Sequence, residues 1–233
     1  ILLSGLLRTP SGLMNLLQMT VLSYYFGNNG RTPYVHYMLL LGIPAFLGQL
    51  IAAGAAPKLA DKHGAATTFA QANVFAGLAL LAAFALFLCR PQQLTQALPF
   101  TLLILLLFCN MFCCGLVNTV QSILIADAAD LTEKESGIRR DGIFVSGQSL
   151  LIKLSTGVSA LLQGVVFAIS GFSGTAVRQI NRALYAGADF ATDPSFATPR
   201  FAMFFLFLCL PGIAYLLSAL PYRKSRNPHK APV

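Results

Sequence analysis

Polar side chains recur at helical spacing inside apolar stretches of the sequence, and one of these sets carries a charge. The set runs through Ser146, Ser149, Lys153 and Thr156 at intervals of three or four residues. Residues at this spacing lie on one face of a helix. Because a lysine in an apolar environment needs water or a partner charge around it, this face predicts a hydrophilic cavity that binds a polar or charged solute.

Two other apolar stretches carry polar faces without a charge. Asn15, Gln18 and Tyr25 share a face of the first stretch, and Asn118 and Gln121 share a face of the fourth. Three polar faces on three helices predict a single cavity. The alternative is that these side chains hydrogen-bond between helices and hold a bundle together, a role that Asn, Gln and Ser often have.

Lys153 has no counter-ion that the sequence places near it. It lies ten positions beyond Ile143, so it is roughly 15 Å into its stretch and near the midplane of a core ~30 Å thick. All eight acidic residues fall in expected loops or at helix ends, namely Asp61, Asp127, Asp130, Glu133, Glu135, Asp141, Asp189 and Asp193. We therefore expect water, a bound ligand or an acidic residue outside this sequence to neutralise Lys153.

The elements that carry these residues are expected to be membrane helices. The sequence is 56% hydrophobic and only 10% charged, whereas soluble domains are about a quarter charged. A helix of ~20 apolar residues crosses a bilayer, and six stretches qualify: residues 11–27, 34–56, 65–89, 98–126, 143–171 and 201–220. Since backbone groups in lipid must bond within their own segment, the sequence predicts an all-α integral membrane protein with six transmembrane helices and a basic cytoplasmic tail at 221–233.

The basic residues orient these helices, because Lys and Arg in short loops favour the cytoplasmic side. If the first helix starts inside, ten basic residues lie in the inner loops and tail: Arg8, Lys58, Lys62, Lys134, Arg139, Arg140, Arg223, Lys224, Arg226 and Lys230. Five lie outside: Arg31, Arg90, Arg178, Arg182 and Arg200. Both ends are therefore expected in the cytoplasm, and this topology explains the formal net charge of +8 without a nucleic-acid partner.

Two further patterns concern packing. The five cysteines lie in the apolar stretches, and the three histidines lie in or beside loops without clustering, so no metal site is expected. Small residues recur every fourth position as Gly48, Ala52 and Ala56 and as Ala160, Gly164 and Ala168. Such rows predict close approach of helix backbones.

The connection between the fourth and fifth stretches carries a recognisable motif. It reads Ala126-Asp127-Ala128-Ala129-Asp130, then Gly137-Ile138-Arg139-Arg140-Asp141-Gly142, and is followed by Lys153. This resembles the signature of the glycoside-pentoside-hexuronide:cation symporter family, the melibiose permease group, in which A-D-x-x-D precedes G-x-R-x-E-G and an intramembrane lysine. Asp141 stands where that family has Glu.

Two weaker matches accompany this motif. Tyr24-Tyr25-Phe26 is similar to an aromatic cluster in the seventh helix of that family. Leu59-Ala60-Asp61-Lys62-His63-Gly64 resembles a short loop motif of the major facilitator superfamily, with Pro57 in place of its first Gly and Ala65 in place of a basic residue.

The resemblance implies that the sequence is the C-terminal half, helices seven to twelve, of a twelve-helix major facilitator fold. It implies a bacterial inner-membrane transporter that moves a sugar or glycoside together with a cation, Na⁺ or H⁺, by alternating access. The cation ligands would lie mainly in the missing N-terminal half. Five charged residues would form a cytoplasmic gate, namely Asp61, Asp127, Asp130, Arg139 and Arg140; the alternative is that these are solvated loop charges.

Two other functions remain open. Asp127 and Asp130 are spaced as in a membrane enzyme that holds Mg²⁺ against a lipid headgroup, but Leu131 and Thr132 follow where such enzymes need Gly and Arg. We therefore do not expect an enzyme or a bound cofactor. A non-transporting membrane scaffold of the same fold is the other alternative.

Overall fold

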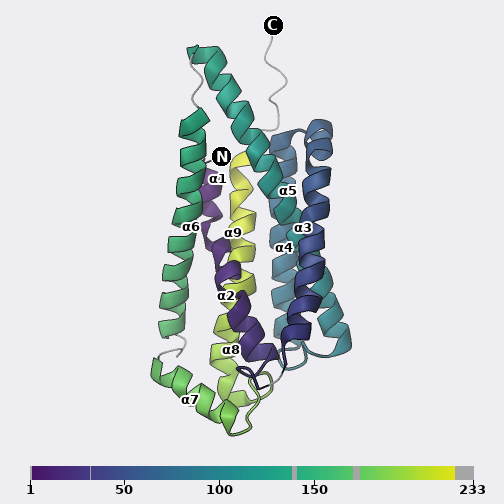
Figure 1. The fold of residues 1–233 in the computed structure, drawn as a ribbon, viewed down its shortest axis with the longest axis vertical. Coiled ribbons are helices and arrows are strands. Elements are labelled where there is room, and N and C mark those ends of the chain that lie inside the picture. The colour runs from purple at the N-terminus through teal and green to yellow at the C-terminus, as the bar shows by residue number, and fades with distance from the viewer. Residues whose placement is uncertain (1, 32, 138–140, 170–173, 224–233) are drawn as a thin grey trace.

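The computed structural model describes residues 2–31, 33–137, 141–169 and 174–223, and all regular structure in these ranges is helical. Five helical segments are long and apolar enough to cross a membrane: α3 (Val35–His63), α4 (Ala65–Cys89), α5 (Ala97–Ser136), α6 (Asp141–Ile169) and the segment from Pro194 to Tyr222. Figure 1 shows these segments aligned along the long axis of the molecule, with the short helix α7 at one end. The expectation of an all-helical membrane protein is confirmed.

The first expected helix, at 11–27, is a broken segment that begins at Leu2. It consists of α1 (Leu2–Leu7), the 3₁₀ turn η1 (Thr9–Gly12), α2 (Leu13–Val21) and the π-helical turn η2 (Leu22–Phe26). Pro10 accounts for the break, because it has no N–H to donate to the carbonyl of Leu6. The hydroxyl of Thr9 donates to that carbonyl at 2.8 Å. The first of the six expected helices is therefore not a single regular helix.

The last segment is also irregular and begins before its expected start at Phe201. It consists of η3 (Pro194–Phe196), α8 (Ala197–Phe204), the π-helical turn η4 (Phe205–Cys209), α9 (Leu210–Ser218) and α10 (Leu220–Arg223). Pro211 cannot donate to the carbonyl of Phe207 and its ring crowds that oxygen, which explains the wide turn that precedes it.

Helix α5 extends well past its expected end at Ala126. It ends at Ser136, and Gly137 follows with φ 68°, a left-handed conformation that glycine adopts without strain. The N–H of Gly137 closes the helix by donating to the carbonyl of Glu133 at 2.8 Å. Asp127 and Asp130, which follow the expected end of this helix, therefore lie on its last turns.

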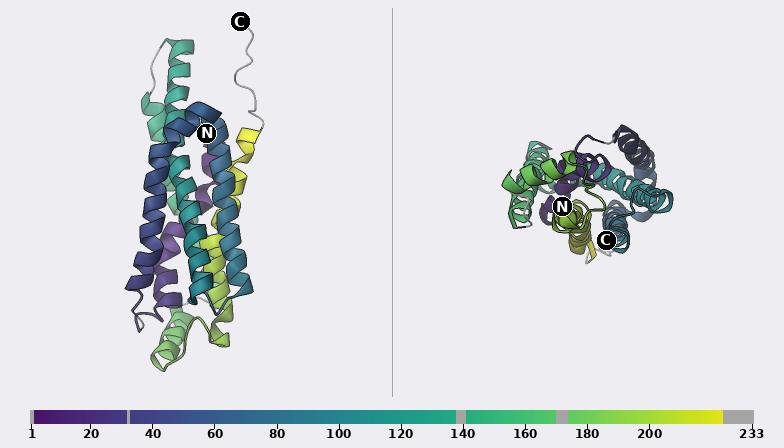
Figure 2. Two further views of the ribbon diagram at one scale, coloured as in Figure 1. Left: turned by 90° about the vertical axis from the view of Figure 1, so that its right-hand side faces the viewer. Right: turned by 90° about the horizontal axis from the view of Figure 1, so that it is seen from below.

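The helices form two groups, which Figures 1 and 2 show from several sides. In one group α5 packs against both α3 and α4; in the other the first segment packs against α6, α8 and α9. Contacts between α4 and α9 join the groups. If the chain is divided before α5, each group therefore combines helices of both parts. The first segment of the first part packs against α6 and the last segment, and α5 of the second part packs against α3 and α4.

Small residues bring α3 and α5 close together. Gly48, Ala52 and Ala56 are buried, and a Cβ at Gly115 of α5 would lie 2.6 Å from the backbone oxygen of Gln49. This row packs as expected. The corresponding row on α6, from Ala160 to Ala168, lies exposed on the surface of the chain.

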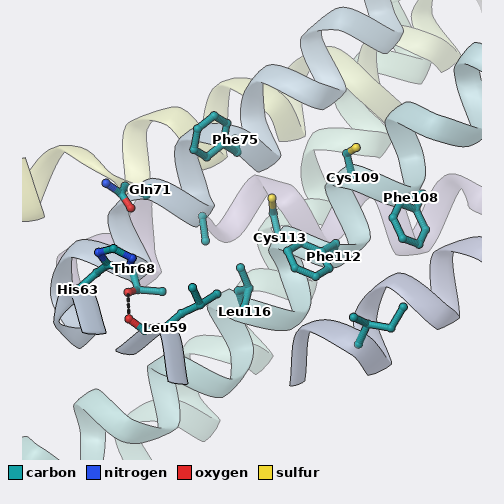
Figure 3. A pocket seen from close by; sticks show the side chains of 12 residues that line it. Leu59, His63, Thr68, Gln71, Phe75, Phe108, Cys109, Phe112, Cys113 and Leu116 are labelled. Atoms are coloured by element: carbon teal, nitrogen blue, oxygen red, sulfur yellow. Dashed lines mark hydrogen bonds between the residues drawn. The ribbon is translucent and has the colours of Figure 1, made fainter. Parts of the chain in front are cut away.

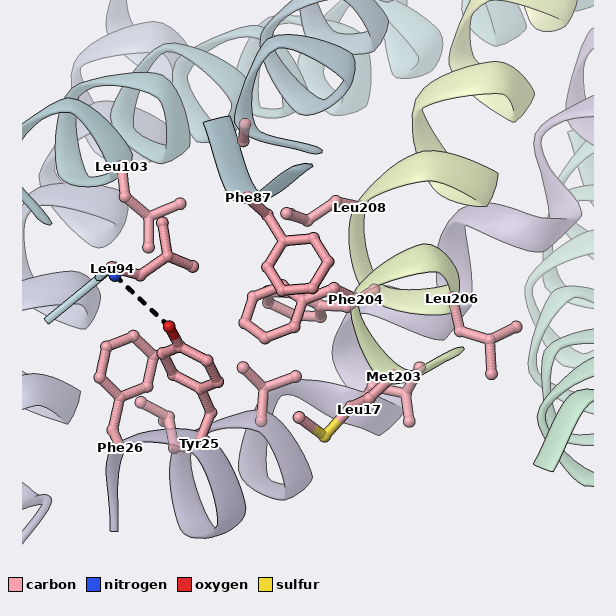
Figure 4. Packing of buried hydrophobic residues seen from close by; sticks show 14 of the residues in the cluster. Leu17, Tyr25, Phe26, Phe87, Leu94, Leu103, Met203, Phe204, Leu206 and Leu208 are labelled. Carbon is pink, nitrogen blue, oxygen red and sulfur yellow. Dashed lines mark hydrogen bonds between the residues drawn. The ribbon is translucent and has the colours of Figure 1, made fainter. Parts of the chain in front are cut away.

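The main hydrophobic core lies between the first segment, α4 and the last segment (Figure 4). The rings of Phe87 and Phe204 stack with their centroids 4.2 Å apart, and Tyr25 meets Phe204 edge-on at 5.0 Å. Tyr25 is 2% exposed, and its hydroxyl donates to the carbonyl of Pro91 at 2.9 Å. The structure thus places Tyr25 in this core rather than on a cavity wall.

A cap covers the end of the bundle opposite the α3–α4 turn. Helix α7 (Gly174–Tyr185) lies across this end (Figure 1), and its Asn181 accepts hydrogen bonds from Tyr24 at 3.1 Å and Asn29 at 3.0 Å. Arg200 is 4% exposed and donates to the carbonyls of Phe190 at 2.9 Å and Ala191 at 2.6 Å. The polar region between the fifth and sixth stretches is therefore an ordered cap over most of its length.

The last segment starts with an N-cap in this region. The Asp193 carboxylate accepts from the backbone N–H of Ser195 at 2.9 Å and from its hydroxyl at 2.7 Å. These hydrogen bonds hold the pKa of Asp193 below its usual range.

Candidate functional site

A polar cavity of about 370 Å³ lies where the first segment is broken. It is enclosed by the first segment, α3, α5, α6 and α9. Its lining includes nine polar side chains: Arg8, Ser11, Asn15, Gln49, Asn118, Gln121, Ser155, Thr156 and Tyr215. Within a set of apolar helices, such a concentration of hydrogen-bonding groups indicates a place where water or a polar solute resides.

Arg8 is the charged residue of this lining. It is half-buried at the end of α1, and its Nη2 donates to Oε1 of Gln121 at 2.7 Å. A guanidinium carries five N–H donors, and in the described ranges Gln121 is the acceptor found for it. Arg8 therefore retains donors for a ligand in the cavity.

The break in the first segment is held against α6. The carbonyl of Thr9 accepts hydrogen bonds from Oγ of Ser155 at 2.7 Å and from Oγ of Ser159 at 3.0 Å. A Cβ at Gly12 would lie 2.7 Å from Oγ of Ser159, so a larger residue at this position would have to displace that hydroxyl. Two serines of α6 thus hold the broken part of the first segment against the wall of the cavity.

Other buried polar side chains link helices without lining the cavity. Ser4 donates to the carbonyl of Ser218 at 2.6 Å, and Ser218 donates to Oδ1 of Asn73 at 2.8 Å. Asn110 donates to the carbonyl of Ala76 at 3.1 Å. These residues have the bundle-holding role that the sequence left as an alternative for polar residues in helices.

The sequence-predicted binding residues divide between the cavity and other places. Asn15, Asn118, Gln121 and Thr156 belong to its lining. Gln18 lines a separate, mostly apolar void of about 50 Å³, and Tyr25 lies in the core. The predicted lysine and its two upstream serines are exposed on α6 and are not part of this lining: Ser146, Ser149 and Lys153.

The face that α6 turns toward the first segment explains why some predicted residues line the cavity and others do not. Its Ser155 and Ser159 face the first segment, and a residue two positions away on a helix points roughly 200° around the axis. Lys153 therefore lies on the opposite side of α6 from Ser155. Its expected role at a central cavity stays a prediction that depends on what covers this side of the helix.

Sequence reasoning misses Arg8, Ser11, Gln49, Ser155 and Tyr215. Arg8 falls in an expected cytoplasmic loop, because a basic residue at the edge of an apolar stretch is counted as a flanking charge. A signal is nevertheless present, since Arg8, Ser11 and Asn15 continue one helix face for two turns. Tyr215 gives no such signal; its hydroxyl contacts Sγ of Cys114 at 3.0 Å.

Three of the five expected gate residues are described, and they lie at one end of the bundle. Asp61 is exposed near the end of α3, and Asp127 and Asp130 are exposed on the last turns of α5. Arg139 and Arg140 lie outside the described residues. The gate thus remains an expectation.

A metal centre is not formed by the residues that the structure describes. Within these ranges no group of three or more His, Cys, Asp or Glu side chains is placed to hold a metal ion.

One comparison with known proteins identifies a transporter family. The model of the family described as MFS/sugar transport protein matches residues 1–223. A protein of Pseudescherichia vulneris, described as an uncharacterized 29.9 kDa protein in the crtE 3' region, is 26% identical over 167 residues. That match covers 72% of this chain and 56% of the relative, so the chain spans about half of the relative's length. No solved structure gives a significant match.

Proposed function

Because the chain belongs to the MFS/sugar transport protein family, we propose that it provides substrate-binding helices of a secondary transporter for a sugar or glycoside. Transport takes place by alternating access, in which a central site opens to one side of the membrane and then to the other. The chain acts in this proposal as the six-helix half of a twelve-helix protein in a bacterial inner membrane.

The polar cavity at the break is the observation that carries this proposal. Its volume of about 370 Å³ falls in the range of small-molecule sites, roughly 300–1,000 Å³. A sugar presents hydroxyls that both donate and accept hydrogen bonds. The Asn, Gln, Ser, Thr and Tyr side chains of the lining can do the same, and Arg8 adds donors.

The irregular backbone at the cavity supports the same function. Transporters of this kind place their sites near the midplane, next to helices that are interrupted there. The interruption at Thr9–Gly12 frees backbone groups beside the cavity, and the two serine hydroxyls satisfy one of them. Such a break is tolerated in a membrane because it lies inside the protein.

Two helices support the presence of a second half. In the apolar 18-residue part of each membrane-spanning segment, only 11% of α3 and 6% of α6 is buried, against 44% to 56% for α4, α5 and the last segment. In our proposal the other six helices cover parts of α3 and α6, including the side that carries Lys153. The coupling cation, Na⁺ or H⁺, is bound mainly by that half, since no acidic side chain lines the cavity described here.

The test uses the full-length transporter in proteoliposomes with an imposed Na⁺ or proton gradient. We expect saturable uptake of at least one sugar or glycoside from a panel of radiolabelled candidates. Gln121→Ala should reduce this uptake, because it removes both a cavity group and the partner of Arg8. Gln96→Ala, at an exposed site outside the cavity and away from α6, is the matched control. Gradient-independent behaviour for every sugar tested would reject coupled sugar transport.

A further inference from the structure

A second large hollow lies on the outer surface of the α3, α4 and α5 group, away from the polar cavity (Figure 3). It is a groove of about 530 Å³ with walls from α3 and α4 and a floor from α5. The floor consists of Phe108, Cys109, Phe112, Cys113 and Leu116. Because α3 and α4 contact α5 far more than each other, they form a wedge-shaped opening above this floor.

The polarity of this groove is confined to one end. His63, Thr68 and Gln71 lie together at the α3–α4 turn, whereas the rest of the lining is apolar or thiol (Figure 3). The Thr68 hydroxyl donates a hydrogen bond to the carbonyl of Leu59 at 3.1 Å. In the ranges that the structure describes, neither the His63 ring nor the Gln71 amide has a hydrogen-bond partner. The polar end of the groove therefore has free donors.

Positive charge gathers at the same end. Lys62 and His63 occupy the last turn of α3, and both Lys58 and Lys62 are exposed. Residues three apart lie on adjacent rows of a helix, so the row of Lys58 and Lys62 lies next to the row of Leu59 and His63 that lines the groove. Asp61, the acidic residue of this turn, lies roughly 200° around the helix from Leu59 and points away from the groove.

The length of the groove matches one leaflet of a bilayer. From Ile51 to His63 along α3 the rise is roughly 18 Å, and half of a ~30 Å core is about 15 Å. The α3–α4 turn is at the end that the basic residues assign to the cytoplasm. An apolar groove thus extends from the cytoplasmic headgroup level to about the midplane.

We propose that this groove binds one anionic phospholipid of the cytoplasmic leaflet. One acyl chain lies along Phe75, Phe108 and Phe112, and the phosphate lies beside Lys62 and His63. Basic pockets between membrane helices on the cytoplasmic side bind anionic headgroups in this way. The occupant fills the wedge between α3 and α4, so it is a structural ligand distinct from the transported solute.

The experiment uses the full-length protein in nanodiscs with two lipid probes. One is phosphatidylglycerol with a photoreactive diazirine in its acyl chain, and the other is phosphatidylcholine with the same chain. After illumination, mass spectrometry locates and quantifies the crosslinked peptides. We expect phosphatidylglycerol to label the peptide spanning 108–116, and unlabelled phosphatidylglycerol to compete better than phosphatidylcholine.

Two pairs of variants separate binding from general solvation by lipid. Lys62→Gln should lower labelling by phosphatidylglycerol about fivefold, the effect of one basic residue near an anionic surface, whereas Lys134→Gln on α5 should not. Cys109→Trp fills the groove and should lower labelling, whereas Cys89→Trp, at another exposed cysteine, should not. If a Trp variant fails to fold, the lysine pair decides the question.

Three results would overturn the proposal. Equal labelling by both probes would mean unspecific lipid contact, and unchanged labelling in Lys62→Gln would remove the headgroup site. Absence of label from 108–116 would mean that protein, rather than lipid, covers the groove. Each of these readouts is independent of sugar uptake, so it stands or falls separately from the transport function.

Discussion

At the scale of single residues, Arg8 is the most informative side chain in the molecule. It combines a full charge, partial burial, a defined partner in Gln121 and a position on the cavity wall. A buried or half-buried cation is costly unless it is used, because desolvation opposes it. We therefore expect Arg8 to contact the transported solute.

Replacing Arg8 by Ala should weaken sugar binding about tenfold, since a charge-assisted hydrogen bond to the solute is lost. Arg8→Lys should recover part of this loss, because an ammonium keeps the charge without the planar fork of donors. Equilibrium binding to the purified full-length protein measures both effects. An unchanged dissociation constant in Arg8→Ala, with Gln96→Ala as the reference, would assign Arg8 a purely structural role.

Lys153 leads to a different prediction. It is exposed on the side of α6 that faces away from Ser155, and we propose that it meets the second half of the transporter. Lys153→Ala should abolish coupled uptake and leave insertion and thermal stability nearly unchanged, because it removes a costly charge and no packing. Lys153→Arg should restore uptake poorly.

Uptake and thermal stability must be measured on the same preparation of each Lys153 variant. Normal coupled uptake, or a loss of uptake that only follows unfolding, would exclude a coupling role.

Part of the site can be read from the sequence because polar residues within apolar stretches are conspicuous. Asn15, Asn118, Gln121 and Thr156 are found in this way. Arg8 and Ser155 are not, since one lies at the edge of a stretch and the other lies off the polar face that the sequence predicts. The direction in which a helix turns a given face depends on its neighbours, and periodicity alone does not determine it.

At the scale of elements, hydropathy locates the apolar segments well but not their interruptions. The expected range 65–89 coincides with α4 (Ala65–Cys89). The first and last segments break where Pro10 and Pro211 remove a backbone donor, and hydropathy does not register a missing N–H. The predicted end of α5 comes too early because Asp127 and Asp130 follow the apolar stretch, although the helix continues to Ser136.

The close approach of α3 and α5 provides a stability prediction. Gly115→Ala would put a Cβ 2.6 Å from the backbone oxygen of Gln49 and 2.8 Å from Cβ of Ala52. Backbone cannot yield as a flexible side chain does, so we expect a loss of about 1–3 kcal/mol through overpacking. Gly54→Ala on α3 is the control and should be neutral, because a Cβ at Gly54 would meet no atom within 4 Å.

Thermal unfolding of both glycine variants in detergent measures the difference. Equal melting temperatures for Gly115→Ala and Gly54→Ala would show that α3 and α5 are not held at this distance.

At the scale of the whole molecule, most of the apolar spans of α3 and α6 is exposed, and in our proposal a second six-helix half covers part of both. The polar cavity is bounded by five segments but has no acidic lining residue. Alternating access requires a second body that moves against this one.

The chain reconstituted alone into liposomes should therefore give no saturable sugar uptake above protein-free vesicles, with the full-length transporter as the positive control. Retained helicity by circular dichroism shows that the chain is folded in this assay. Gradient-driven accumulation of sugar by the chain alone would contradict the two-half mechanism.

The hydrogen bonds between the first segment and helices late in the sequence have a consequence for biosynthesis. Arg8 and Gln121 are 113 residues apart, and Thr9 and Ser159 are 150 residues apart. At ~5–20 residues per second, a ribosome needs roughly 8–30 s to supply the second of these partners. Gln121 is made after roughly 6–23 s, so the broken, charged first segment has neither partner before that point and lacks Ser159 until the interval ends. We therefore expect this segment to stay beside the membrane insertion machinery until α6 has emerged.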